Sequence, residues 1–186
     1  ETVTEGLFKQ IKILNIPAIK NINYDWLQEK LDNKFKEKFI LFIPGVSQKG
    51  IYKQWSPVKF GELAKYCEEK KYQICIVGTY QDKKSVINIL KNCNKVINNI
   101  EQSPPEIIYS IAKKAHLIIS NDTGPMHISA AQGTDTIGLF GPNTPVRYAP
   151  YGNNNISLYK SKEAPVINPH LGSFKLPSQD WMEKIT

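Results

Sequence analysis

Residues 117–127 read LIISNDTGPMH, and this stretch decides the fold of the chain. Its first three residues are apolar, which is typical of a short strand buried on both faces. The turn at residues 120–124 is small and polar, and residues 125–132 have the composition of a short helix. A helix N-terminus after such a turn presents free backbone N–H groups and about half a positive charge. The stretch therefore predicts an anion site at the end of a buried strand.

The same alternation of strand and helix patterns continues on both sides of this stretch, from Phe39 to Phe140. Short apolar strands separated by helices predict βαβ units, and therefore an α/β fold with a Rossmann-like parallel sheet covered by helices on both faces. Ser56 and Ser103 are predicted helix caps because proline follows each of them. The predicted strands are residues 39–43, 74–77, 96–97, 117–120 and 136–140, and the predicted helices start near residues 56, 81, 103 and 125.

Turn-forming residues follow four of the predicted strands. Ligands of parallel sheets bind at the carboxyl ends of the strands, so these loops should meet at one edge of the sheet. We therefore predict a binding cleft formed by residues 44–45, 78–79, 122–124 and 141–143.

Residues 1–38 differ from the rest of the chain. One helix is predicted over Glu5–Leu14 and a second over Tyr24–Leu31, within a segment that contains Pro, Asn and Lys. This composition indicates a linker rather than part of the sheet, so we divide the chain into residues 1–38 and 39–186. The tail beyond Lys160 has three prolines and is predicted to be irregular.

The formal net charge is +7, and lysine supplies nearly all of it. The lysines are scattered, whereas nucleic-acid-binding proteins cluster their charge and interleave aromatic residues, so we expect no nucleic-acid partner. A solvated surface and attraction to an anionic membrane both fit this charge. No apolar run reaches the ~18 residues of a membrane span. The three cysteines lack metal-ligand spacing, so we expect free thiols, no bound metal and a cytoplasmic setting.

Three familiar motifs can be set aside. Residues 45–50 have the glycine spacing of a P-loop, but Ile51 and Tyr52 stand where Lys and Ser or Thr should hold phosphate and magnesium. No G-x-G-x-x-G follows a predicted strand, which argues against a nicotinamide-dependent dehydrogenase. Residues 122–124 match the aspartic-protease tripeptide, but a helical pattern follows them, and no second copy supplies the paired carboxylate.

Three side chains are candidates for chemistry at the predicted anion site, and each has a structural alternative. Lys53 could reach the cleft as a mobile charge, or be a solvated lysine beside Trp55. His127 should point back toward the helix N-terminus, where it could meet an anion, although a core or capping histidine is the alternative. Asp122 suits sugar hydroxyls, but it could also serve only to cap the helix.

These residues together resemble the carboxyl-terminal half of glycosyltransferase family 9, the heptosyltransferases of lipopolysaccharide core synthesis. The resemblance covers roughly residues 39–151, and its most specific parts are the D-T-G-x-x-H turn and the F-G-P loop at their mutual spacing. Residues 1–38 resemble the last helix of the family's amino-terminal domain and the interdomain linker. The matching positions are Pro44–Gly45, Lys53, Trp55, Gly78, residues 121–127, Ala130–Ala131 and residues 140–143.

The resemblance implies one half of a GT-B enzyme, in which two Rossmann-like domains face each other across a cleft. This half would bind the donor, ADP-heptose. By resemblance, the turn at residues 123–125 holds the diphosphate, Lys53 and His127 offset its charge, and Asp122 binds heptose hydroxyls. Also by resemblance, Ser47 would approach the phosphates, Asp82 the ribose and Ser103 the adenine. The donor-binding residues implied in this way are Ser47, Lys53, Asp82, Ser103, Asp122, Thr123, Gly124, Pro125 and His127.

The implied activity is inverting transfer of heptose from ADP-heptose to the lipopolysaccharide inner core. A lysine, a histidine and a helix N-terminus can stabilise the leaving diphosphate without a metal or other cofactor. The general base should be a carboxylate of the amino-terminal half, so no catalytic residue is assigned here and the chain alone should be inactive. That half would also hold the lipid-linked oligosaccharide acceptor, and peripheral contact with the inner membrane is compatible with the basic surface. Two alternatives stay open: a related GT-B transferase or epimerase with another sugar nucleotide, and a non-catalytic nucleotide-sugar-binding module.

Overall fold

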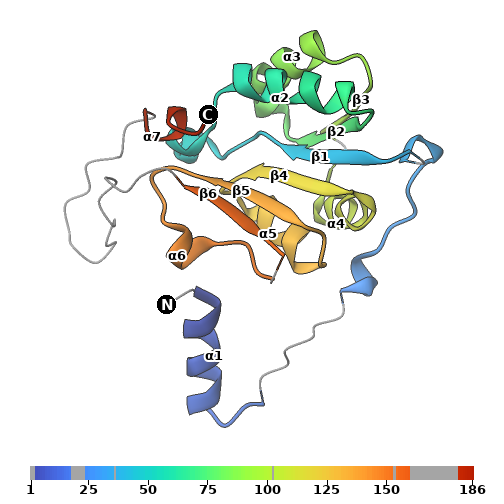
Figure 1. Cartoon of the computed structure of the whole chain (residues 1–186). Helices are drawn as coiled ribbons and strands as arrows, with labels where there is room; N and C mark the ends of the chain where they lie inside the picture. The colour runs from blue at the N-terminus through green and yellow to red at the C-terminus, as the bar shows by residue number, and fades with distance from the viewer. Residues whose placement is uncertain (1–2, 18–23, 36, 102, 153, 160–179) are drawn as a thin grey trace.

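The computed structural model describes residues 3–17, 24–35, 37–101, 103–152, 154–159 and 180–186. Its centre is a sheet of six parallel strands in the order β3-β2-β1-β4-β5-β6 (Figure 1). This is the strand order of the Rossmann fold, so the predicted fold class is confirmed. The strands are β1 (Phe39–Ile43), β2 (Gln73–Gly78), β3 (Val96–Ile100), β4 (Leu117–Asn121), β5 (Thr136–Phe140) and β6 (Ile156–Tyr159).

Helices cover both faces of the sheet (Figure 1). The α-helices are α1 (Val3–Ile13), α2 (Pro57–Glu69), α3 (Lys83–Asn92), α4 (Pro105–Lys114), α5 (Gly124–Ala131), α6 (Pro145–Tyr148) and α7 (Asp180–Glu183). Four short 3-10 turns complete the described elements: η1 (Asp25–Leu27), η2 (Asn33–Phe35), η3 (Gln48–Lys53) and η4 (Tyr80–Asp82).

The central strand β1 shows why the core has two layers. Successive side chains of a strand point to opposite faces. Ile40 and Phe42 therefore join one apolar cluster with residues of α2 and α3, while Phe39, Leu41 and Ile43 join a second cluster with residues of α4. All five side chains are buried, as expected for a central parallel strand.

The strand order reverses between β1 and β4, and this reversal positions the site. From β1 the chain crosses to β2 and then β3 on one side, whereas β4, β5 and β6 extend on the other. The loops that follow β1 and β4 diverge at this point and leave a crevice outside the carboxyl ends of the two strands. The LIISNDTGPMH stretch supplies the β4 side of the crevice, because β4 passes through Asp122 and Thr123 directly into α5.

Several sequence predictions need correction. The helix predicted over Tyr24–Leu31 is wrong: only the single turn η1 forms there. Ser103 does not cap α4, because the N-cap is Pro104 and the Ser103 hydroxyl bonds to Asn99 instead. Ser56 does occupy the N-cap of α2, although its side chain makes no capping hydrogen bond. β6 and α6 were not predicted. The tail beyond Lys160 was predicted to be irregular, but α7 forms at its end, and the rest of that tail, residues 161–179, lies outside the described residues.

The segment between α1 and β1 lies against α4. Asp25 forms an ion pair with Lys113, the Glu29 N–H donates to Ser110 Oγ at 2.6 Å, and Phe35 packs on Phe39 with ring centroids 5.7 Å apart. The predicted first helix is confirmed as α1, and none of its residues is buried. No helix within the described part of the chain is long and apolar enough to span a membrane.

Candidate functional site

A pocket of about 500 Å³ opens at the carboxyl ends of β1, β2 and β4. Three of the four predicted cleft loops meet here, at Gly45, at Gly78 and Thr79, and at the turn before α5. The fourth loop, residues 141–143, does not line this pocket. Seven of the nine predicted site residues do line it: Ser47, Lys53, Asp82, Ser103, Thr123, Gly124 and Pro125.

Asp122 does not itself line this pocket but directly precedes its lining residue Thr123, and it is held by two donors. The Lys53 ammonium lies 3.3 Å from Asp122 Oδ2 and donates to the Asp122 backbone oxygen at 2.8 Å. Asn143, from the loop after β5, donates from Nδ2 to the same Oδ2 at 2.5 Å. The Asp122 side chain is only 7% exposed and that of Lys53 20%, so the ion pair is partly shielded from water. The interpretation of Lys53 as a solvated lysine is therefore wrong.

The N-terminus of α5 has no side-chain cap. Thr123 occupies the N-cap position, and neither its side chain nor that of Asp122 accepts a hydrogen bond from the first turn. Asp122 therefore does not serve as a helix cap, which removes the structural alternative for this residue. The first-turn N–H groups keep their partial positive charge for another acceptor, since capping would have satisfied them.

Asp82 is a buried carboxylate in the wall of the pocket. Its Oδ2 accepts hydrogen bonds from the Thr79 N–H at 2.7 Å and the Thr79 hydroxyl at 2.9 Å, in a capping box at the end of β2. Gly45 and Gly78 make room for it, because a Cβ on either glycine would overlap the carboxyl group. Two glycines and a threonine thus fix this acceptor beside the pocket.

Ser47 and Ser103 differ in how free their hydroxyls are. Ser47 is exposed in the loop after β1 and makes no capping hydrogen bond to η3. The Ser103 hydroxyl donates to the Asn99 backbone oxygen at 2.5 Å and accepts from Asn99 Nδ2 at 3.0 Å. Ser103 is therefore already engaged where it lines the pocket, which makes Ser47 the more available hydroxyl.

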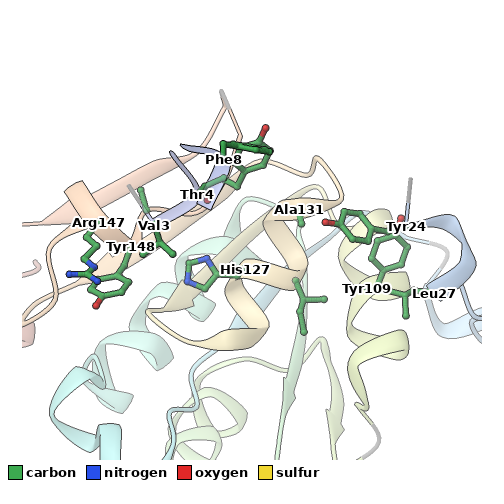
Figure 2. Close-up of a pocket in the computed structure, with 13 residues that line it drawn as sticks. Val3, Thr4, Phe8, Tyr24, Leu27, Tyr109, His127, Ala131, Arg147 and Tyr148 are labelled. Atoms are coloured by element: carbon green, nitrogen blue, oxygen red, sulfur yellow. The ribbon is translucent and has the colours of Figure 1, made fainter. Parts of the chain in front are cut away.

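His127 does not line this pocket but a second cavity of about 750 Å³. In Figure 2 its ring lies on α5 between Tyr148 of α6 and Ala131, with Val3 and Thr4 of α1 across the cavity. Ile128 lines both cavities, so α5 forms the wall between them. Burial lowers the pKa of His127 below its ordinary value of 6.5, with Asp122 opposing the shift and Lys53 adding to it. Both charges of the ion pair therefore act on the pKa of His127.

The lowered pKa predicts a pH-dependent stability. The folded chain binds this proton less tightly than the unfolded chain, so the contribution of His127 is complete above the unfolded pKa of about 6.5 and is lost as the pH falls through the lower folded pKa. Below pH ~6.5 the free energy of unfolding should decline more steeply in the wild type than in His127→Gln. Urea unfolding at several pH values measures this, and parallel curves for the two proteins would contradict it.

Two asparagines of the site were missed as functional residues by sequence reasoning. Asn143 was noted only as part of the F-G-P loop, yet it contacts Asp122 directly. Asn121 is fully buried beside Asp122 and bonds to two other loops. The available signal was positional, because Asn121 ends β4 and Asn143 follows the neighbouring strand β5. Among the described residues, no group of three or more His, Cys, Asp or Glu side chains could hold a metal ion.

Known proteins resemble this chain in both sequence and fold. Residues 7–168 match the model of glycosyltransferase family 9 (heptosyltransferase). The chain is 28% identical over 148 residues to lipopolysaccharide core heptosyltransferase OpsX of Haemophilus influenzae. That match covers 77% of this chain and 42% of OpsX. It is 31% identical over 111 residues to lipopolysaccharide heptosyltransferase 2 of Escherichia coli. That match covers 56% of this chain and 31% of the E. coli protein.

Two solved structures share the fold. One is E. coli ADP-heptose lipopolysaccharide heptosyltransferase II, with a TM-score of 0.64 and 19% identity over 89% of this chain and 46% of that one. The other is E. coli heptosyltransferase WaaC with ADP, with a TM-score of 0.65 and 19% identity. That match covers 79% of this chain and 46% of the WaaC chain. The chain spans less than half the length of these relatives. Since the family model matches most of its residues, the chain belongs to glycosyltransferase family 9.

Proposed function

We propose that this chain is the donor-binding part of an inverting heptosyltransferase that moves heptose from ADP-heptose to the lipopolysaccharide inner core. The observation that carries the proposal is the Lys53–Asp122–Asn143 cluster beside the uncapped N-terminus of α5. It adjoins a pocket of about 500 Å³, in a chain of family 9. Support also comes from neighbours of the same fold that were solved with ADP and with ADP-2-deoxy-2-fluoro heptose.

The diphosphate would bind against the first turn of α5. Free N–H groups and the helix dipole favour an anion there. Lys53 adds a full positive charge at the pocket, and His127 lies one turn further along α5 on the side of the second cavity. When the glycosidic bond to the donor breaks, negative charge develops on the departing diphosphate. The N–H groups and Lys53 would stabilise that charge without needing to rearrange, whereas His127 faces the second cavity and so does not join them.

Asp122 would bind hydroxyls of the sugar. Lys53 and Asn143 both bond to Oδ2, and no donor from the described residues bonds to Oδ1. An ionised carboxylate is a strong acceptor for hydroxyl groups. The two donors would keep the carboxylate charged and oriented while Oδ1 stays available. The sugar would then lie beside Asp122, between the pocket and the His127 cavity.

The nucleoside would occupy the rest of the pocket. Asp82 Oδ2 is engaged by Thr79, which would leave Oδ1 to accept from ribose hydroxyls. Ser103 and Ile108 line the same pocket and would border the base, while Ser47 would approach the phosphates. An adenosine diphosphate would then lie along the carboxyl ends of β2, β1 and β4.

The remainder of the reaction would belong to the part of the enzyme outside this chain. That part would supply the carboxylate base and hold the lipid-linked acceptor, so the chain alone should bind donor without turnover. We assign residues 1–38 to the end of the preceding domain and the interdomain linker, and residues 39–186 to the donor domain. A cytoplasmic location at the face of the inner membrane would suit a lipid acceptor and a net charge of +7.

Calorimetry with the isolated chain tests the proposal. ADP and ADP-heptose should bind more tightly than UDP and UDP-sugars. Asp122→Ala should weaken ADP-heptose binding by about tenfold more than ADP binding, because it removes a charged acceptor from sugar hydroxyls. Equal losses for both ligands would contradict the sugar role of Asp122. Tighter binding of UDP-sugars would instead favour a related transferase or epimerase.

A further inference from the structure

Asn121 is a completely buried polar side chain next to the site. It is 0% exposed, and both halves of its amide are used. Its Oδ1 accepts from the Trp55 backbone N–H at 3.0 Å, and its Nδ2 donates to the Pro44 backbone oxygen at 2.8 Å. One side chain therefore joins the end of β4 to the loop after β1 and to the segment that leads into α2.

The segment that carries Lys53 needs such an anchor. Lys53 is the last residue of η3, a short 3-10 turn that lies outside the sheet and whose backbone departs from helical geometry at Gly50. Lysine is also a flexible side chain whose ammonium is not oriented by its own stem. Trp55 lies two residues after Lys53, so the hydrogen bond from its N–H to Asn121 fixes the backbone from which the lysine extends.

Asn121 is also the residue that precedes Asp122. Asn121 thus fixes the backbone of Asp122 because the two residues are adjacent. It fixes the backbone near Lys53 through its hydrogen bond to Trp55. Neighbouring contacts strengthen the anchor: Gln54 Nε2 donates to the Pro44 oxygen at 3.3 Å and to Ser85 Oγ at 2.7 Å. From the other side, the Trp55 indole N–H donates to the Ile185 oxygen at 3.0 Å.

We propose that Asn121 is a positioning residue for the donor diphosphate, which acts by holding Lys53 over Asp122 and the N-terminus of α5. The inference rests on the proposed function. It goes beyond the proposed function because it assigns a role to a residue that does not line the pocket. A purely structural asparagine would affect every ligand of the pocket equally, whereas a residue that acts through Lys53 affects only ligands with a diphosphate.

The test compares Asn121→Ala with the wild type for ADP and for adenosine, titrated by NMR. ADP affinity should fall by about tenfold, while adenosine affinity stays within about twofold. In a Lys53→Gln background, Asn121→Ala should cause no further loss of ADP affinity, because the residue through which it acts is gone. Equal losses for ADP and adenosine, or additive losses in the double variant, would overturn the proposal.

Asn155→Ala is the matched control. Asn155 also uses both halves of its amide, accepting from the Thr136 N–H at 3.0 Å and donating to the Tyr151 oxygen at 2.6 Å. It lies at the amino end of β5, opposite the site, so its loss should leave the affinity for ADP unchanged. If Asn121→Ala fails to fold, Asn121→Ser replaces it in the same comparison.

A second readout needs no nucleotide, so it separates this inference from the proposed function. Acetic anhydride labelling followed by mass spectrometry reports how accessible each lysine amine is. Lys53 should label several-fold faster in Asn121→Ala than in the wild type, and at the wild-type rate in Asn155→Ala. Unchanged labelling of Lys53 in Asn121→Ala would overturn the positioning role, even if the wild type binds ADP. If the wild type does not bind ADP while Lys53 labelling responds as expected, the proposed function fails, but the positioning of Lys53 by Asn121 stands.

Discussion

Replacing Lys53 with Gln is expected to weaken ADP binding by about a hundredfold. A hydrogen bond to a charged group contributes roughly 1.5–3 kcal/mol, and each 1.4 kcal/mol corresponds to a tenfold change in affinity. The Lys53 side chain is only 20% exposed, so its charge is screened less than that of a surface lysine. Calorimetry with ADP measures the effect, and an affinity within about twofold of the wild type would contradict it.

The same substitution should also destabilise the fold, because it leaves Asp122 nearly buried without its cation. Breaking a fully buried ion pair costs about 3–5 kcal/mol. Here Asn143 still donates to the carboxylate and the pair borders an open pocket, so we expect about 2 kcal/mol. The double variant Lys53→Gln/Asp122→Asn removes both charges and should recover most of that stability without recovering ADP affinity. Lys65→Gln, which changes an exposed lysine of α2, should alter neither quantity.

The central strands could be predicted from sequence because burial on both faces leaves a simple pattern. β1, β2, β4 and β5 each appear as a short apolar run that ends in a turn. β6 escaped prediction because it is an edge strand whose residues alternate between exposed and half-buried positions, so it has no continuous apolar run. An edge strand is defined by its pairing with β5, which local composition does not encode.

The helix ends were predicted less well than the helices themselves. The Ser-Pro-Pro sequence at residues 103–105 correctly indicated that a helix begins there, because proline is favoured in the first turn. It did not show that the Ser103 hydroxyl would bond back to β3 through Asn99. Similarly, a helix was predicted over Tyr24–Leu31, but this segment contacts α4 and forms only η1. Tertiary contacts outweighed local preference at both places.

In the candidate site, too, the features that are local in sequence were predicted and the long-range contacts were not. The turn at residues 122–125 was predictable because strand, turn and helix are contiguous in sequence. Lys53 meets Asp122 across 69 positions, and Asn143 meets it across 21, so neither contact follows from local pattern. Lys53 became a candidate only through the family resemblance and its place before a helix. Asn143 and Asn121 were quoted in motifs, but an asparagine carries no charge that would have singled it out.

Gly45→Ala is expected to lower the free energy of unfolding by about 2–4 kcal/mol and to abolish detectable adenosine binding. Gly45 follows β1 and is buried, and the Cβ of an alanine there would lie 2.5 Å from Asp82 Oδ2 and overlap the rest of the carboxyl group. Asp82 cannot simply turn away, because the N–H and hydroxyl of Thr79 hold Oδ2. Relief of the overlap requires loss of those hydrogen bonds or movement of the backbone after β1. Chemical denaturation and an adenosine titration measure the two effects.

Gly124→Ala is the matched control, because it adds the same methyl group at the opposite wall of the pocket. An ideal Cβ there meets no heavy atom within 4 Å, so the free energy of unfolding should change by less than about 0.5 kcal/mol. Adding Asp82→Ala to Gly45→Ala should restore much of the lost stability, since the overlapping group is removed, but adenosine should still not bind. If instead the double variant is as unstable as Gly45→Ala alone, the loss of stability comes from the backbone of the loop after β1 and not from overlap with the carboxylate. If Gly45→Ala binds adenosine normally, Asp82 does not contact the ribose, because no alanine at this position is compatible with the carboxylate where Thr79 holds it.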